Sequence, residues 1–144
     1  MRPIVALLVL AAASAAAQQP PLPVVELGVG MHRIRAELAE RDATRALGLM
    51  HRTTLPPNGG MLFVFDEAGR HCMWMKNTPL PLSVAFIDAE GAVVNIADMQ
   101  PHTETAHCAE RPVPYALEMA QGWFAERGVR AGFRLRGLDK LKPR

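Results

Sequence analysis

The chain has little of the chemistry that identifies an enzyme from its sequence alone. Its 144 residues include two cysteines, one tyrosine and 6% aromatic residues. No catalytic triad, metal cage or phosphate-binding loop can be recognised among them, and no internal repeat or heptad pattern is present. The sequence therefore indicates a fold, a compartment and a surface more firmly than a reaction, and we expect a protein without a cofactor.

Strong charge of either sign is also absent. The 16 basic and 14 acidic residues give a formal net charge of +2, so nothing calls for a nucleic-acid partner. The basic residues near the C-terminus are spaced out among apolar positions. We interpret them as the solvated face of a strand followed by a basic tail over 139–144, with contact of that tail to anionic lipid as an alternative.

A hydrophobic run long enough to span a membrane is missing as well. The apolar stretch 4–13 is shorter than the roughly 20 residues that a transmembrane helix needs. Arg2 precedes it, and the small residues Ala15-Ala16-Ala17 follow it. This pattern predicts a signal peptide over 1–17, cleaved after Ala17. We expect a periplasmic or secreted protein with no stable membrane insertion after cleavage; an uncleaved anchor is the alternative.

The expected export bears on the oxidation state of the two cysteines, Cys72 and Cys108. An oxidising compartment favours disulfides, and two cysteines leave one pairing possible. We predict a structural Cys72–Cys108 disulfide.

The length fits one domain. The segment 18–30 begins with a polar, proline-rich stretch and is predicted to be an extended leader. The domain should therefore cover 31–138.

Periodicity and turn signals predict a mainly β domain. Two short helices are expected, one over 43–51 capped by Asp42 or Thr44 and one over 121–127. Two hairpins are expected, joining 61–65 to 71–76 and 84–87 to 92–97. About seven strands against two helices indicate an antiparallel β-sandwich or barrel. Its single core should contain Phe63, Phe65, Val84, Phe86, Val94, Ile96, Leu117 and Leu135.

The strongest candidate site lies at Lys76-Asn77-Thr78, before two prolines. Pro79 biases Thr78 to an extended backbone, so an ammonium, an amide and a hydroxyl could converge on a carboxylate or a sugar. The alternative is that Asn77 and Thr78 satisfy the backbone of their own turn. Trp74 could be a stacking platform, but core packing is the favoured interpretation.

Glu118 is the one carboxylate in a strongly apolar strand. A buried carboxylate normally needs a partner, so we expect an ion pair with Lys76 or an arginine. A general acid would need a second carboxylate nearby, and Asp66 and Asp88 lie in turn contexts.

A set of soft side chains could alternatively hold Cu(I). Methionines at strand spacing are more often gap-filling core, and a disulfide would consume any cysteine nucleophile. The set consists of Met73, Met75, Met99, His102 and His107, with His71, Cys72 and Cys108 beside them.

Several motifs resemble the domain-of-unknown-function family 192, over roughly 31–138. They are Gly48-Leu49-Met50-x-Arg52, Gly60-Met61-Leu62-Phe63-x-Phe65, Trp74-Met75-Lys76-Asn77-Thr78-x-x-Pro81-Leu82, Phe86-Ile87-Asp88-x-x-Gly91 and Ala116-Leu117-Glu118. The resemblance implies a small exported or membrane-anchored bacterial or archaeal protein with a mostly β fold, and no established activity. The chain departs from the family pattern at Ser83 and at Gly132-Phe133, where the family often has an aspartate. These departures weaken any metal or acid/base scheme built on those carboxylates.

These patterns favour a non-enzymatic binding module for a small polar ligand, a sugar or a carboxylate, or for an envelope partner. The expected binding residues are Trp74, Lys76, Asn77, Thr78 and Glu118. An envelope hydrolase acting on sugar or peptide and a periplasmic Cu(I)-binding protein are the alternatives.

Overall fold

A computed structural model describes residues 21–141 of the chain. The predicted signal peptide over 1–17 and the last three residues of the predicted basic tail lie outside this range. No helix within 21–141 is long and apolar enough to cross a bilayer.

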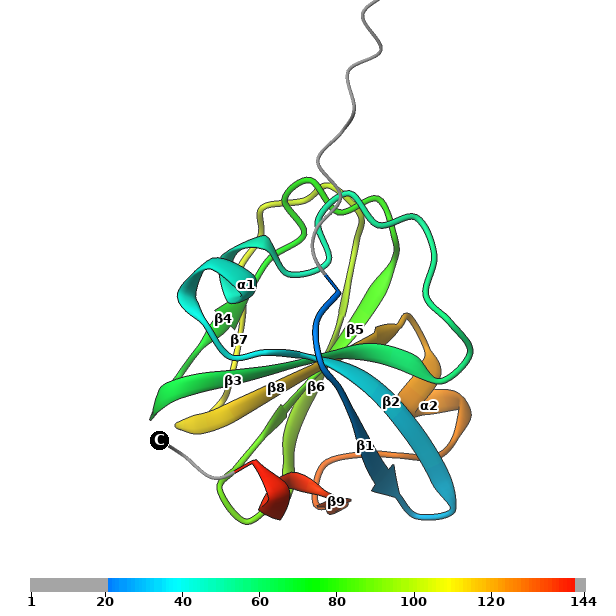
Figure 1. The fold of residues 1–144 in the computed structure, drawn as a ribbon, viewed down its shortest axis with the longest axis vertical. Helices are drawn as coiled ribbons and strands as arrows, with labels where there is room; N and C mark the ends of the chain where they lie inside the picture. The colour runs from blue at the N-terminus through cyan, green and yellow to red at the C-terminus, as the bar shows by residue number, and fades with distance from the viewer. Residues whose placement is uncertain (1–20, 142–144) are drawn as a thin grey trace, which may run out of the picture.

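Strands dominate the described residues (Figure 1). They are β1 (Val24–Val29), β2 (His32–Ala39), β3 (Gly59–Gly69), β4 (Cys72–Met73), β5 (Leu82–Ile87), β6 (Val93–Met99), β7 (His107–Cys108), β8 (Val113–Ala120) and β9 (Leu135–Arg136). The helices are α1 (Asp42–Leu47), α2 (Trp123–Glu126) and a 3-10 turn over Leu138–Lys140. The mainly β fold with two short α-helices is therefore confirmed.

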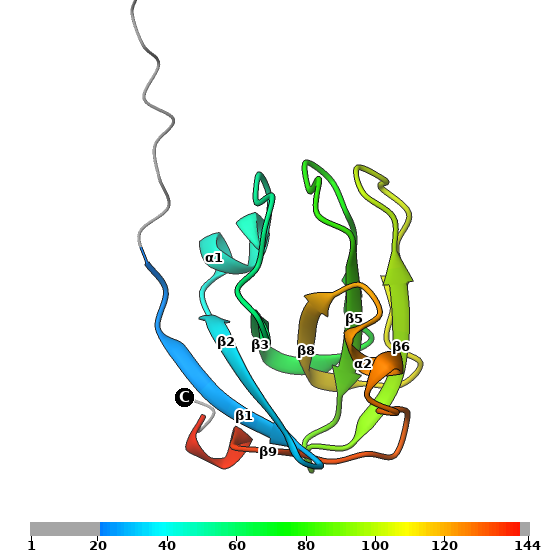
Figure 2. The same cartoon turned by 90° about the vertical axis from the view of Figure 1, so that its right-hand side faces the viewer.

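Seven of the strands form one sheet in the order β6-β5-β8-β3-β2-β1-β9. Figure 2 shows that this sheet curls into a half-barrel, which agrees with the barrel alternative of the predicted fold class. All of its pairings are antiparallel except β2 with β3, which are parallel. A parallel pair needs a crossover connection, and the segment that carries α1 supplies it.

The central strands are buried on both faces of the sheet. Along β5, the side chains of Ala85 and Ile87 join one apolar cluster, whereas Val84 and Phe86 join the other. The helix α2 covers the first face, and the chain after α1 together with Met75 covers the second. This double cover explains why β5 is apolar along its whole length.

The prediction of a single core is therefore wrong. Because successive side chains of a strand point to opposite faces, the eight core residues that we expected divide between two clusters. Leu117 and Leu135 belong to the first cluster with Ile96 packed against it, and Phe63, Val84 and Phe86 belong to the second with Phe65 and Val94 packed against it.

One of the two expected hairpins is also wrong. The strand β3 continues to Gly69 and pairs with β2 and β8, so it never turns back onto 71–76. The short strand β4 pairs with β7 instead. The hairpin of β5 and β6 is confirmed.

Two local features in the first part of the domain differ from the sequence-based predictions. Val24–Val29, which we had placed in the extended leader, is a sheet strand paired with β2 and β9. The helix α1 has Arg41 as its N-cap, where we had expected Asp42 or Thr44. The Thr44 hydroxyl closes this end from inside the first turn, because it accepts a hydrogen bond from the Arg41 N–H at 3.1 Å and donates one to the Arg41 carbonyl at 3.0 Å.

Candidate functional site

Three loops meet at one end of the half-barrel, at the top of Figure 2. The middle loop carries Lys76-Asn77-Thr78, and its backbone is bonded to both neighbours. The His51 N–H donates to the Asn77 carbonyl at 2.8 Å, and the His102 N–H donates to the Thr78 carbonyl at 3.1 Å. A further bond runs from the Met75 N–H to a carbonyl of the 100–106 loop at 2.9 Å. The middle loop is therefore fixed from two sides.

The residues at these loop contacts adopt an uncommon backbone. His51, Asn77 and His102 have φ values of 66°, 51° and 60°. Such left-handed conformations cost on the order of 1 kcal/mol for residues other than glycine, and they persist where the surrounding structure imposes them. Asparagine tolerates this region better than most residues, which explains Asn77 at the corner.

A small cavity lies below these loops, which we call the Glu118 cavity. Its volume is about 30 Å³, enough for about two water molecules. Trp74, Lys76, Thr78 and Glu118 line it, together with Phe63 and the segment 45–50. Four of the five expected site residues are thus brought to one place, and Asn77 is absent from the lining.

Trp74 and Lys76 lie at the exposed side of the cavity. Trp74 is 46% exposed, so the expectation that it belongs to the core is wrong. The Lys76 Nζ lies 5.2 Å from the centroid of the Trp74 ring, within the range of a cation–π contact. The strand alternation that places Trp74 with Cys72 and Lys76 was the signal for its exposure, since both of those residues are exposed too.

Thr78 satisfies the backbone of its own turn, which was the structural alternative to a binding role. Its side chain is buried, and its hydroxyl donates to the Lys76 carbonyl at 3.0 Å. This bond holds the turn that presents the Lys76 side chain. Thr78 is therefore a positioning residue of the turn.

Glu118 lies on β8, opposite Met61 of β3 and Val84 of β5. Both neighbours are fully buried and Glu118 is 3% exposed. Among residues 21–141, no ion pair joins its carboxylate to a cation, so the expected ion pair is wrong. Desolvation raises the pKa of Glu118 to about 8, because burial without a cationic partner penalises the charged form. The group is therefore mostly a neutral carboxylic acid at pH 7.

Arg45 is a residue of the cavity wall that the sequence analysis missed. Its guanidinium donates to the carbonyls of Glu40 and Val64, both at 2.8 Å, and pairs with Asp42 and Asp66. These contacts engage the Arg45 guanidinium, which explains why it forms no ion pair with Glu118. They also hold α1 against β3, and the Asp42-x-x-Arg45 spacing was the available signal.

Gly48 follows α1 directly and forms part of the wall of the Glu118 cavity. Gly48 has a φ of 50°, and a Cβ built on it would lie 3.3 Å from the ring of Phe63. Both the conformation and the space favour glycine. The cavity wall therefore depends on a position where any side chain would be strained.

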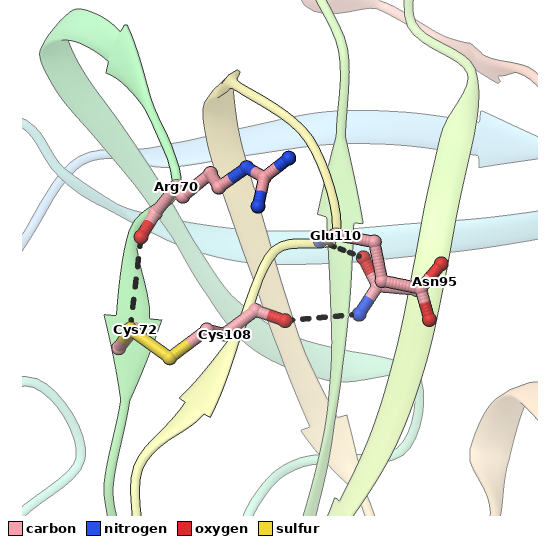
Figure 3. The surroundings of a disulfide bond; sticks show 5 residues. All are labelled: Arg70, Cys72, Asn95, Cys108 and Glu110. Atoms are coloured by element: carbon pink, nitrogen blue, oxygen red, sulfur yellow. Dashed lines mark hydrogen bonds between the residues drawn. A yellow bond between two sulfur atoms is a disulfide. The ribbon is translucent and has the colours of Figure 1, made fainter.

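The predicted Cys72–Cys108 disulfide is confirmed, with Cα atoms 4.0 Å apart. Figure 3 shows how the Asn95 side chain holds the second cysteine's segment. Its amide donates to the Cys108 carbonyl at 3.1 Å, and its oxygen accepts from the Glu110 N–H at 3.1 Å. The disulfide and Asn95 thus link β4 and β7 to the edge strand β6.

The soft side chains considered for Cu(I) are placed differently from one another. Met75 and Met99 are fully buried in the second core cluster, and Met73 reaches the Glu118 cavity. The His71 ring stacks on Phe65 with centroids 3.7 Å apart. The remaining pair, His102 and His107, lies in the 100–106 loop and in β7. Within 21–141, no group of three histidine, cysteine or acidic residues is arranged to hold a metal ion.

Ser83, a departure from the family pattern, has a structural role. It is buried, its hydroxyl accepts a hydrogen bond from the Gly122 N–H at 3.0 Å, and it donates to the Asp98 carboxylate. A carboxylate therefore remains beside this position, supplied by the neighbouring strand β6.

We predict that replacing both cysteines, Cys72→Ser with Cys108→Ser, lowers the free energy of unfolding by about 4 kcal/mol. The bond closes a sequence separation of 36 residues, and losing it frees the unfolded chain. Urea unfolding measures the loss. Amide exchange at His102 should also become faster, because its loop lies inside the closed segment. Equal stability with and without the bond would contradict this.

We predict that Glu118→Gln stabilises the protein at alkaline pH and not at pH 5. The native carboxyl keeps its proton up to about pH 8, whereas the unfolded carboxyl loses it near 4.5. Stability therefore falls as pH rises between these values, by on the order of 5 kcal/mol in total. The glutamine variant lacks this fall, so the two unfolding curves should diverge between pH 5 and 8. Parallel curves would show that Glu118 is ionised in the folded state.

Comparisons with known proteins give the chain a family. The family model of DUF192, described as "Uncharacterized ACR", matches residues 25–137. A protein from Sinorhizobium meliloti 1021, described as a candidate transcription regulator, is 35% identical. The alignment covers 83% of this chain and 98% of that one, with a TM-score of 0.80.

A protein of unknown function from Novosphingobium aromaticivorans DSM 12444 is 32% identical, with 86% of this chain and 96% of that chain covered and a TM-score of 0.76. No functionally curated protein matches. The chain belongs to the domain-of-unknown-function family 192.

Proposed function

We propose that this protein is a non-enzymatic binding module that takes the polar end of a small ligand, a carboxylate or a sugar, at the Glu118 cavity. The observation that carries the proposal is the unpaired carboxyl of Glu118. It is buried in a cavity that Lys76 and Trp74 also line. A carboxyl group that is buried without a cation destabilises the fold, and such a cost is commonly met at sites that bind something.

The groups around the cavity offer complementary contacts. The Lys76 ammonium supplies a positive charge for a carboxylate, and the exposed Trp74 ring supplies a flat face for a sugar. Below them, the neutral Glu118 supplies one O–H donor and an acceptor oxygen. A ligand oxygen that enters this small cavity would gain these bonds. The fixed middle loop means that little order has to be created on binding.

The hydrolase alternative has less support. Among the described residues that line the cavity, Glu118 is the sole carboxylate, and the Thr78 hydroxyl is bonded to the backbone. Glycoside hydrolysis generally needs two carboxylates. The copper alternative loses the thiolates of Cys72 and Cys108, which are joined to each other. An envelope component that carries a carboxylate or a sugar remains compatible with the binding proposal.

The test is a thermal-shift screen of the mature protein against glycans, small carboxylates and Cu(I), because a ligand of the folded state raises the apparent melting temperature. For a carboxylate hit, Lys76→Ala should weaken binding by about tenfold or more, since it removes a charge-assisted contact. Arg70→Ala is the matched control, because it removes one positive charge from an exposed residue outside the Glu118 cavity.

The pH gives a second readout. Affinity for an anionic ligand should fall as pH rises through about 8, where Glu118 ionises and repels it. If Trp74→Ala, Lys76→Ala and Glu118→Gln all leave the affinity unchanged, the ligand binds at another surface. Turnover of a hit would make the protein an enzyme, and a response to Cu(I) alone would favour the copper alternative.

We further propose that the chain is exported and works in the periplasm or outside the cell. The disulfide supports this, because such bonds persist in oxidising compartments and are rare in the cytosol. The expected mature protein begins at Gln18. Intact-mass measurement of the expressed protein tests the cleavage, and a membrane-bound or cytosolic product that retains residues 1–17 would refute it.

A further inference from the structure

The C-terminal end of β1, β9 and the C-terminal turn lie at the opposite end of the half-barrel from the loops (Figures 1 and 2). A second hollow is lined by residues of β1, β2 and this turn. We call it the arginine hollow. Its volume is about 560 Å³, which is in the usual range for small-molecule sites. Its charged lining consists of Glu26, Arg33, Arg35, Arg136, Asp139 and Lys140. It shares no lining residue with the Glu118 cavity, so an inference about it is independent of the proposed function.

The strand register places two of these arginines around a glycine. Gly28 of β1 is opposite Arg33 of β2 on one side and opposite Arg136 of β9 on the other. Directly paired residues share a face of the sheet, so both side chains rise from the same surface. Arg35 is two residues from Arg33 and lies on that face as well. The row therefore places Arg33 and Arg136 on either side of Gly28.

The glycine leaves the space that the Arg136 head occupies. A Cβ built on Gly28 would lie 2.6 Å from the Arg136 Nη2. The same Nη2 donates to the Gly30 carbonyl at 2.8 Å, which fixes the guanidinium over the strand. A guanidinium has five N–H donors in a fixed fork, so donors remain for a ligand.

These charges have no ion-pair partners within 21–141. None of the four cations or two carboxylates of the lining forms a salt bridge there, although Glu26 is directly opposite Arg35 in the sheet. The excess of cations favours an anion. The two carboxylates at the same hollow can accept hydrogen bonds from hydroxyl groups.

We propose that the arginine hollow binds a small phosphorylated ligand that carries hydroxyl groups, of the chemical class of the sugar phosphates. The phosphate group lies against the guanidinium groups of Arg33 and Arg136, and the hydroxyl groups face Glu26 and Asp139. A phosphate suits this row better than a carboxylate does, because its three terminal oxygens and charge of about −1.5 to −2 can engage several guanidinium groups at once.

The test is calorimetric titration at low salt with glucose 6-phosphate, glucose, inorganic phosphate, and vesicles of phosphatidylglycerol and phosphatidylcholine. Glucose 6-phosphate should bind with a Kd of about 1 mM or tighter. Inorganic phosphate should bind about tenfold or more weakly, because it lacks the hydroxyl contacts, and glucose should give no signal.

The variants locate the site. Arg33→Gln and Gly28→Ala should each weaken glucose 6-phosphate binding by about tenfold or more. The glycine variant keeps every charge but displaces the Arg136 head, whose flexible end can move without unfolding the strand. Arg136→Gln gives the same readout if that variant does not fold. Arg70→Gln is the control, because Arg70 is an exposed cation outside the hollow. Lys76→Ala is measured separately, because Lys76 lines the Glu118 cavity and reports binding there.

Several results would overturn the proposal. One is the absence of glucose 6-phosphate binding at about 10 mM, far above the expected Kd. Another is an equal loss in Arg70→Gln, which would indicate diffuse charge attraction. Binding of the phosphatidylglycerol vesicles, with no binding of glucose 6-phosphate, would mean that the surface attaches to an anionic membrane. A loss confined to Lys76→Ala would move the ligand to the Glu118 cavity, and it would leave that site's binding role standing.

Discussion

A carboxyl group buried on an interior strand of the sheet, without a cation to pair with, is the constraint that the rest of this structure must accommodate. β8 lies between β3 and β5, and its residues from Tyr115 to Met119 are all buried. Glu118 meets this enclosure by taking up a proton, which the rise of its pKa to about 8 expresses. The neutral acid then occupies the second core cluster at a free-energy cost that grows with pH.

The surrounding elements keep that carboxyl apart from the nearby cations. Arg45 is tied to backbone carbonyls and to two exposed aspartates. Lys76 is carried on the exposed side by a turn that Thr78 and the neighbouring loops hold in place. The disulfide and Asn95 fix the far side of the loop cluster. A cation, a neutral acid and an aromatic ring are thus presented together without neutralising one another.

Much of the fold was predictable because alternation and turn residues are local signals. The apolar run of β5, its hairpin with β6 and the burial of Glu118 all follow from residues close together in the sequence. The predictions failed where the structure of a segment depends on contacts with residues that are distant in the sequence. β1 was missed because Gly28 and Gly30 break its pattern, and its pairing with β2 and β9 supplies what propensity does not. The ion pair expected for Glu118 is absent among the described residues because Arg45 is engaged by two aspartates and by two backbone carbonyls, and only the Asp42 contact has a local sequence signal.

The most direct measurement is a carbon-13 NMR titration of the Glu118 side-chain carboxyl in the folded protein, with Glu118→Gln used to assign the resonance. The account predicts a single titration with its midpoint near pH 8. A midpoint at or below the ordinary value of about 4.5 would mean that the carboxylate is ionised and paired, and it would contradict the account.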